Sequence, residues 1–185
     1  MRKFPPIALA LVALALSTTA CSGPTSTTTT TRDIPGPATR LEITSSGGDI
    51  TLVPTTGAMR VTETATYTGK APHATLDVHD GVVALATAGC GGHHGACGIT
   101  YRVEIPAGLT IRLASDGGAV HVRGTVAGLD IRSAGGDVAV RLDTAPASLA
   151  VDSGGGRTTL HLPPGSYPSP SVSIRTGGGD LDVES

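Results

Sequence analysis

Ile131-Arg-Ser-Ala-Gly-Gly-Asp-Val-Ala-Val140 is one of five copies of a ten-residue phrase that runs through this chain. Each copy reads apolar, any, Ser or Thr, any, Gly, Gly, any, apolar or Thr, any, apolar, with identical offsets. The other copies occupy residues 43–52, 113–122, 151–160 and 174–183. An internal repeat of this length is typical of stacked supersecondary units, so the repeat decides the fold class.

Each copy is expected to form a strand, a tight glycine corner and a second strand. Leu129 and Ile131 precede the corner of the quoted copy, and Val138 and Val140 follow it. Apolar residues spaced by two place one face of each strand into a core, because side chains alternate across a strand. Paired glycines supply the positive φ angles that a sharp bend needs, and the preceding Ser or Thr can hydrogen-bond the corner backbone. The predicted structural corner glycines are Gly47, Gly48, Gly117, Gly118, Gly135, Gly136, Gly155, Gly156, Gly178 and Gly179.

The spacing between copies favours an all-β solenoid. The last four copies begin at residues 113, 131, 151 and 174, so the steps are 18, 20 and 23 residues. A hairpin array normally uses about 8–12 residues per strand and turn, so these longer steps fit either one coil of a β-solenoid or two strands of a meander. We favour a parallel β-solenoid of the β-helix type, because stacking explains why the corner recurs in register. An antiparallel meander stays open as the alternative.

An acidic residue follows the glycine pair in alternate copies. Asp49, Asp137 and Asp180 occupy this position, whereas Ala119 and Arg157 replace the acid in the second and fourth copies. Stacked residues would lie about 4.8 Å apart, where like charges repel. The alternation therefore predicts charge relief along a ladder. It argues against a shared calcium site, which needs several converging oxygen ligands.

The start of the chain has the pattern of an export signal. A basic start precedes an apolar stretch over residues 7–16, which is too short to span a bilayer as a helix. A small residue directly before Cys21 resembles a bacterial lipobox, in which the cysteine is lipidated and becomes the mature N-terminus. Thr18 departs from the leucine that usually lies three residues before this cysteine. We predict a lipoprotein signal peptide over residues 1–20 and lipidation at Cys21, with ordinary cleavage nearby as the alternative.

A threonine- and proline-rich segment follows the predicted signal. Residues 21–38 include an unbroken threonine run over residues 27–31 and have too few apolar side chains to bury a core. This composition predicts a flexible tether that holds one domain, over residues 39–185, off the membrane. The chain has a formal net charge of −2 and no cluster of Lys or Arg, so we expect no nucleic-acid partner.

The stretch between the first two copies follows another pattern. These copies begin 70 residues apart, at residues 43 and 113. Strand-like alternation covers residues 60–67, 74–78, 82–86 and 99–105. His79-Asp80-Gly81 has the composition of a tight turn between the middle two strands. We expect an insert at about residues 57–106 that forms an antiparallel hairpin set at the solenoid's N-terminal end, since terminal units of repeat proteins are often atypical.

The insert carries clustered side-chain chemistry in Cys90-Gly-Gly-His-His-Gly-Ala-Cys97. In one interpretation Cys90 and Cys97 form a disulfide, because an exported chain meets an oxidising compartment. In the other, Cys90, His93, His94 and Cys97 bind a soft divalent or monovalent metal, since these side chains are the usual zinc ligands. Two adjacent histidines in one short loop strain tetrahedral closure. We therefore favour the disulfide and keep the metal site as the alternative.

The sequence lacks the common catalytic motifs. It has no Gly-x-Ser-x-Gly elbow, no paired-carboxylate motif and no glycine-rich loop that leads into a helix. The corner serines are placed to bond backbone groups. His121 and His161 fall beside apolar positions and should point away from the core. We therefore expect no enzymatic activity and no cofactor.

The repeated Ser-x-Gly-Gly-Asp corners resemble those of a bacterial domain family of unknown function that carries the label "putative adhesin". The stretch Tyr101-Arg-Val-Glu-Ile-Pro-Ala-Gly108, just before the dense repeats, is similar too. The likeness covers residues 39–185, and the lipobox and the two-cysteine loop look like features of actinobacterial lipoprotein members. The resemblance implies a right-handed parallel β-solenoid and an envelope location. It implies no catalytic residues.

Together these observations predict a non-enzymatic lipoprotein at the outer face of the cytoplasmic membrane. The anchor at Cys21 and the tether would display a rigid solenoid for adhesion, or for binding an envelope component or a protein partner. Free strand edges at the solenoid's ends offer a route for strand addition, and the C-terminal strand over residues 181–183 is the preferred contact. The alternative function is metal binding or sensing through the cysteine–histidine loop.

Overall fold

The computed structural model describes residues 24–89, 95–164 and 172–184 of the 185-residue chain. These residues form β-strands, and among them no helix is long and apolar enough to cross a membrane. In chain order the strands are β1 (Thr25–Asp33), β2 (Arg40–Ser45), β3 (Ile50–Pro54), β4 (Arg60–Thr68), β5 (His73–His79), β6 (Val82–Ala88), β7 (Cys97–Ile105), β8 (Leu109–Ser115), β9 (Val120–Gly124), β10 (Val126–Ser133), β11 (Val138–Leu142), β12 (Ser148–Ser153), β13 (Thr158–His161), β14 (Val172–Thr176) and β15 (Leu181–Glu184).

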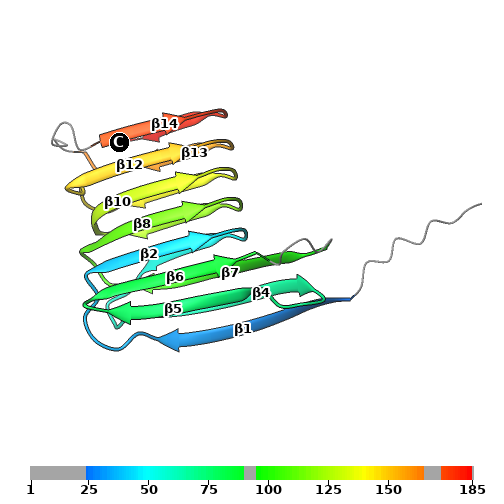
Figure 1. Cartoon of the computed structure of the whole chain (residues 1–185). Coiled ribbons are helices and arrows are strands. Elements are labelled where there is room, and N and C mark those ends of the chain that lie inside the picture. The colour runs from blue at the N-terminus through cyan, green and yellow to red at the C-terminus, as the bar shows by residue number, and fades with distance from the viewer. Residues whose placement is uncertain (1–23, 90–94, 165–171, 185) are drawn as a thin grey trace, which may run out of the picture.

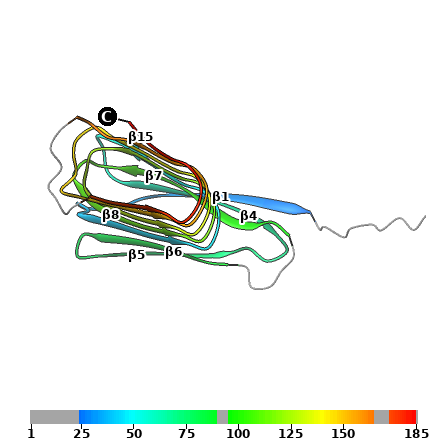
Figure 2. The same cartoon turned by 90° about the horizontal axis from the view of Figure 1, so that it is seen from above.

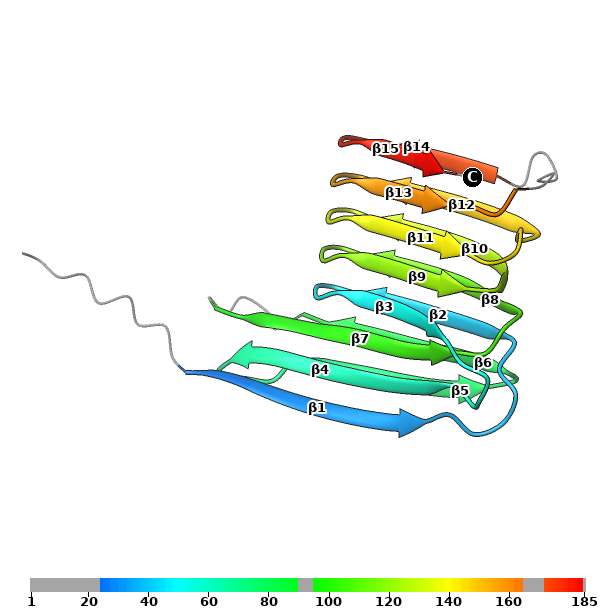
Figure 3. The same ribbon diagram turned by 180° about the vertical axis from the view of Figure 1, so that it is seen from behind.

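The strands form two sheets that face each other across a narrow core, as the view along the stack shows (Figure 2). The eight-stranded sheet has the order β1-β4-β7-β3-β9-β11-β13-β15, and the seven-stranded sheet has the order β14-β12-β10-β8-β2-β6-β5. From β8 onward the chain alternates between the sheets, so each coil gives one strand to each (Figures 1 and 3). Neighbouring coils pair in parallel and in register. The β-solenoid is therefore confirmed, and the meander is excluded.

The repeated phrase forms the corner of each coil. In four copies the serine hydroxyl donates a hydrogen bond to the carbonyl of the first corner glycine. These pairs are Ser45–Gly47 (3.0 Å), Ser115–Gly117 (2.6 Å), Ser133–Gly135 (2.6 Å) and Ser153–Gly155 (2.7 Å). The second glycine of each pair has positive φ, and at Gly136 it is +82°. A Cβ at Gly136 would overlap the carbonyl of Gly118 in the preceding coil, so glycine is what lets the coils stack closely here.

The inward side chains of both sheets form one continuous apolar core. Ile131 and Val140 of one coil are 0% and 2% exposed. The largest fully buried side chain is Tyr101, whose hydroxyl lies 2.5 Å from Oγ1 of Thr87. Burial raises the pKa of Tyr101 above its ordinary value, and the hydrogen bond to Thr87 opposes part of that rise. The buried Tyr101 hydroxyl therefore has a hydrogen-bond partner within the core.

The N-terminal end of the solenoid is assembled out of sequence order. The coil of β2 and β3 lies between the coil of β6 and β7 and the coil of β8 and β9. Antiparallel pairs join β1 to β4, β4 to β7 and β5 to β6, which confirms the predicted antiparallel hairpins at this end. The second half of the insert is itself a coil of the solenoid, because β6 and β7 pair in parallel with β2 and β3.

Residues 25–33 form β1, which corrects the expectation of a flexible tether across the whole of residues 21–38. β1 pairs with β4 along its full length. Side-chain contacts between the two strands are Thr29–Thr64 (3.3 Å), Thr31–Thr62 (3.2 Å) and Asp33–Arg60 (2.6 Å). Threonine is β-branched and suits a pleated surface, and cross-strand threonine pairs stabilise it further. The folded unit therefore includes the threonine run.

The acidic residues of the corners have a structural role that the sequence did not predict. The coils of the five copies stack in sequence order, so no two acids are neighbours on the ladder. Oδ1 of Asp49 accepts a hydrogen bond from the backbone N–H of Ala119 at 2.8 Å, and Oδ1 of Asp137 accepts one from Arg157 at 2.8 Å. Asp49 and Asp137 therefore each accept the corner amide of the next coil, which is a strong, charge-assisted contact.

Candidate binding surfaces

Most of the side chains predicted to form sites lie outside the described residues. Cys97 is the first residue of β7, whereas Cys90, His93, His94 and Cys21 fall outside the described ranges. The disulfide, its metal-binding alternative and the lipidation therefore stay predictions. Within residues 24–89, 95–164 and 172–184, no group of three or more His, Cys, Asp or Glu side chains is arranged to hold a metal ion.

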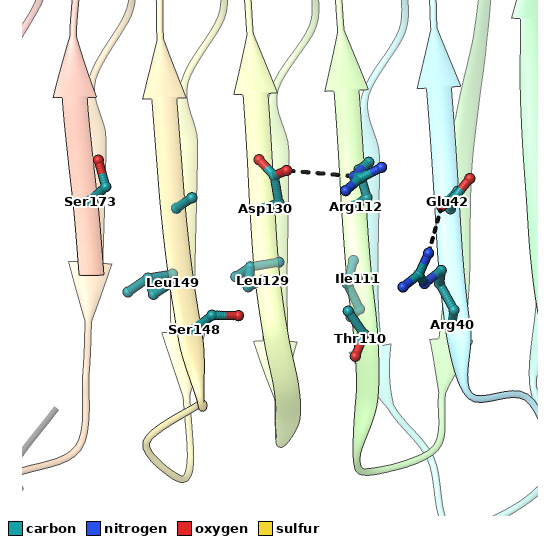
Figure 4. Close-up of a pocket in the computed structure, with 11 residues that line it drawn as sticks. Arg40, Glu42, Thr110, Ile111, Arg112, Leu129, Asp130, Ser148, Leu149 and Ser173 are labelled. Carbon is teal, nitrogen blue, oxygen red and sulfur yellow. Dashed lines mark ion pairs between the residues drawn. The ribbon is translucent and has the colours of Figure 1, made fainter. Parts of the chain in front are cut away.

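The outward face of the seven-stranded sheet has a shallow hollow of about 350 Å³ (Figure 4). The hollow lies where small side chains occupy outward positions on neighbouring strands. Gly128 of β10 stands in register between Thr110 and Ser148, and Ala150 stands beside Asp130. A Cβ at Gly128 would approach the Ser148 hydroxyl to 2.8 Å, so glycine at this position leaves room for the Ser148 side chain.

The charged side chains that line this hollow are paired with one another. Figure 4 shows Arg112 pointing at Asp130, with Nε and Oδ2 3.5 Å apart, and Arg40 lying 3.5 Å from Glu42. Arg132 also contacts Asp130, at 3.6 Å. Such exposed ion pairs contribute about 0–1 kcal/mol each, so their main effect is to neutralise the face.

The outward face of the eight-stranded sheet is arranged differently. Arg123 of β9 and Arg141 of β11 are register partners, and His161 of β13 continues the same row. A hollow of about 200 Å³ lies beside this row, over Ala139. His121 is exposed and His161 is half-exposed, so both point outward as predicted. The arginine pair was missed from the sequence, although the 18-residue offset between its members equals one repeat step.

The last coil is the exposed end of the core. Leu181 and Val183 of β15 stack in register on Thr158 and Leu160, which are fully buried. Leu181 and Val183 themselves are 48% and 49% exposed. Val172 of β14, at the same end, is also exposed. The end of the stack therefore presents apolar side chains between two strand edges.

Polar side chains lie at the N-terminal end of the stack, opposite the last coil. Glu63 of β4 points inward and is only 7% exposed, with Oε1 3.6 Å from Nη1 of Arg32 on β1. These two residues, with Tyr67 and His73, border a hollow of about 410 Å³ between the sheets. The ion pair lies where apolar contacts would otherwise continue the core, so the core ends here at a partly polar hollow.

Comparisons with known proteins support the fold. No protein-family model matches the sequence, and no curated protein matches it either. A crystal structure of a "putative cell adhesion protein" from Clostridium sporogenes superposes with a TM-score of 0.61 at 12% identity, covering 86% of this chain and 99% of that chain. The two proteins share a fold.

Two further crystal structures give weaker superpositions. They are a "putative adhesin" from Bacteroides fragilis, with a TM-score of 0.38, and a "putative adhesin" from Parabacteroides distasonis, with a TM-score of 0.31. Each is 12% identical to this chain and covers 86% of it and 97% of its own length. The resemblance seen in the corner repeat is matched in part, by the fold shared with the Clostridium sporogenes protein.

Proposed function

We propose that this protein is a non-catalytic binding protein of the bacterial cell envelope, which captures an extended segment of a protein partner on its last coil. The observation that carries the proposal is the open end of the core at β14 and β15. Leu181 and Val183 are about half exposed there, whereas the residues beneath them are fully buried. One more strand laid on β15 would bury both side chains, which is the driving force for capture.

The backbone at this end is also prepared for strand addition. β14 and β15 are the terminal strands of their sheets, so one edge of each has no neighbouring strand among the described residues. Exposed edges of this kind bind extended peptides through main-chain hydrogen bonds. Asp180 occupies the corner position from which Asp49 and Asp137 accept the amide of the next coil. An added strand would offer its amide to Asp180 in the same way.

The charges on β15 select the kind of segment that fits. Asp182 and Glu184 alternate with Leu181 and Val183 along the strand, and Asp180 precedes them. Opposite charges on neighbouring strands are stabilising, and like charges are destabilising. The preferred partner is therefore an extended segment in which apolar residues alternate with Lys or Arg.

Attachment to the membrane near the N-terminus would point the last coil, β14 and β15, away from the membrane. Cys21 lies four residues before the start of β1 at Thr25, and β1 and the last coil lie at opposite ends of the stack (Figure 1). A lipid on Cys21 would hold β1 near the bilayer and leave β14 and β15 farthest from it. The shared fold with a protein described as a cell adhesion protein supports this display role.

Site-specific photocrosslinking in cells tests the capture of a partner. A photoreactive amino acid replaces the exposed Ser173 on β14 of the last coil, and the control replaces Arg112 farther along the seven-stranded sheet. We expect a crosslinked protein at position 173 only, attached through a segment with alternating apolar and basic residues. Val183→Asp should abolish the crosslink, and Val183→Ile should keep it. A crosslink to β14 or β15 of a second copy, equal capture at both positions, or no capture would overturn the proposal.

Labelling with an alkyne-tagged fatty acid tests the anchor. The wild-type protein should incorporate the label and sediment with membranes, and Cys21→Ser should lose both properties. Cys97→Ser is the matched control, because it removes a different cysteine and should keep the label. Incorporation into the Cys21→Ser variant would contradict the assigned anchor.

A further inference from the structure

Two arginines lie side by side on the outward face of the eight-stranded sheet. Arg123 of β9 and Arg141 of β11 are register partners in a parallel pair of strands. Register partners on neighbouring strands lie about 4.8 Å apart, so two positive charges are held close together. Both side chains are exposed. Among the described residues, no ion pair joins either guanidinium to a carboxylate.

The other sheet shows how the same fold neutralises an arginine. Arg112 of β8 has Asp130 as its register partner on β10, and the two side chains form an ion pair at 3.5 Å. Like charges directly opposite each other destabilise a sheet. Stacking of the coils does not require repulsion between Arg123 and Arg141, because an acidic residue at position 141 would replace it with attraction. A pair of unneutralised arginines is therefore better explained by a ligand than by the architecture.

The surface beside the pair is shaped to receive a small group. Ala139 stands in register between His121 and Thr159, so a short side chain is flanked by longer ones. Together with the arginines these residues border the hollow of about 200 Å³. Glu184 lies on its far rim, where Oε2 is 3.2 Å from Nδ1 of His161. That acid is engaged by the histidine and leaves the arginines without a carboxylate.

We propose that Arg123 and Arg141 form a binding site for a phosphate group, with the hollow over Ala139 as its seat. A guanidinium presents a planar fork of N–H donors that pairs with phosphate oxygens in a bidentate manner. A tetrahedral phosphate has enough oxygens to accept from two forks at once. His121 and the Thr159 hydroxyl border the same hollow and add donors around it. Binding relieves the repulsion between the arginines.

The same chemistry fits a phosphate-bearing polymer and a phospholipid headgroup, both of which occur in cell envelopes. The site lies on a side face of the stack, and the open edge of β15 used for the proposed capture of a partner is at its end. Figure 3 shows β9 and β11, the strands that carry Arg123 and Arg141, between β3 and β13. The phosphate site and the partner edge are thus tested independently.

Titration of inorganic phosphate into the purified protein tests the site. Isothermal titration calorimetry should show saturable binding that weakens by about ten-fold or more in the Arg123→Gln, Arg141→Gln double variant. The matched control is the Arg112→Gln, Arg132→Gln double variant, which removes the same charge from the other sheet. Its affinity should stay within about two-fold of wild type. Equal losses in both variants, or no saturable binding to wild type, would overturn the proposal.

Thermal unfolding gives a second readout that does not depend on affinity alone. In phosphate-free buffer, Arg141→Gln should raise the melting temperature, because it removes the repulsion from Arg123. Added phosphate should raise the melting temperature of wild type more than that of the double variant, since the general salt effect acts on both proteins and binding at the site adds to it only in wild type. A fall in the melting temperature of Arg141→Gln would contradict the reasoning.

Two further probes identify the source of the phosphate. Polyphosphate chains represent a polymer, and vesicles that contain phosphatidic acid represent a headgroup. Tighter binding of polyphosphate than of vesicles assigns a polymer, and the reverse assigns a lipid. In either case the Arg123→Gln, Arg141→Gln variant should lose binding, and the control double variant should keep it. Retention of both probes by the Arg123→Gln, Arg141→Gln variant would show that the site lies elsewhere.

Discussion

Alanine at the second corner glycine should weaken the stack far more than alanine at the first. Gly136 has φ of +82°, and a Cβ there would overlap the carbonyl of Gly118, which is backbone and cannot move aside alone. A left-handed conformation costs a non-glycine residue about 1–2 kcal/mol. Displacing the corner weakens two neighbouring hydrogen bonds, at about 0.5–1.5 kcal/mol each. The lower entropy of the unfolded alanine chain returns about 0.4–1 kcal/mol. Gly136→Ala should therefore destabilise the fold by about 3 kcal/mol, within the range that these terms allow.

Gly135→Ala is the matched control, because the same methyl group is added one residue away. Nothing lies within 4 Å of a Cβ at Gly135, and its φ is not positive. Its effect should stay within about 0.5 kcal/mol. Thermal unfolding followed by circular dichroism separates the two, since about 3 kcal/mol corresponds to a fall in Tm of about 6–12 °C for a domain of this size. Equal melting temperatures for the two variants, or a lower one for Gly135→Ala, would refute the reasoning.

The other predictions concern polar contacts. Tyr101→Phe leaves the Thr87 hydroxyl buried without its hydrogen-bond partner. The free energy of unfolding, measured in urea, should fall by about 1–3 kcal/mol. Because burial raises the pKa of Tyr101, the unfolded chain loses the phenolic proton first as the pH rises above about 10, so wild-type stability should fall there and Tyr101→Phe should flatten that fall. Ser133→Ala removes the bond to the corner carbonyl and should cost about 1 kcal/mol, with Ser133→Thr retaining part of it. Asp137→Ala should lower the free energy of unfolding by about 1 kcal/mol, because it removes the hydrogen bond from the amide of Arg157. Asp180 accepts no amide among the described residues, so Asp180→Ala should leave Tm nearly unchanged. Equal changes in Tm for the two variants would show that the contact of Asp137 does not stabilise the fold.

Most of the fold can be predicted from the ten-residue repeat, because each of its positions has one structural role. Alternating apolar residues face the core, the serine bonds the corner carbonyl, and the second glycine adopts positive φ. The step between copies equals the length of one coil, so register follows from the repeat itself. These features are local in sequence or recur at the same place in every copy. They are therefore readable without knowledge of which strands meet.

The N-terminal end was less predictable because its order depends on contacts between distant segments. The coil of β6 and β7 lacks the glycine phrase, and nothing local indicates that it stacks on the far side of β2 and β3. The threonine run was interpreted from its low hydrophobicity, which is typical of a tether. Its β-branched side chains instead find matching threonines on β4. Which segment supplies the partner strand is a tertiary fact that composition does not contain.

The candidate surfaces divide in the same way. The outward direction of His121 followed from alternation, whereas the pairing of charges across coils needed the register. Arg112 and Arg123 lie at outward positions on consecutive strands of one coil, and only the register shows that the first faces Asp130 and the second faces Arg141. A one-residue slip in either pairing would turn the partner side chain to the opposite face of its sheet. The phosphate site is therefore a property of the stack and not of any single repeat.

The core ends differently at the two ends of the solenoid: at a polar contact at one end and at exposed apolar side chains at the other. This difference bears on function. At the N-terminal end the buried Glu63 pairs with Arg32, so the core stops at a polar contact. At the C-terminal end the apolar side chains continue to the last strand, and an edge of this kind normally promotes aggregation. Asp182 and Glu184 change that outcome, because two β15 edges laid against each other would oppose acid with acid. The same acids favour a basic strand. The edge therefore resists pairing with its own kind while remaining open to a partner of opposite charge, which is the selectivity that a binding surface needs and a structural cap does not.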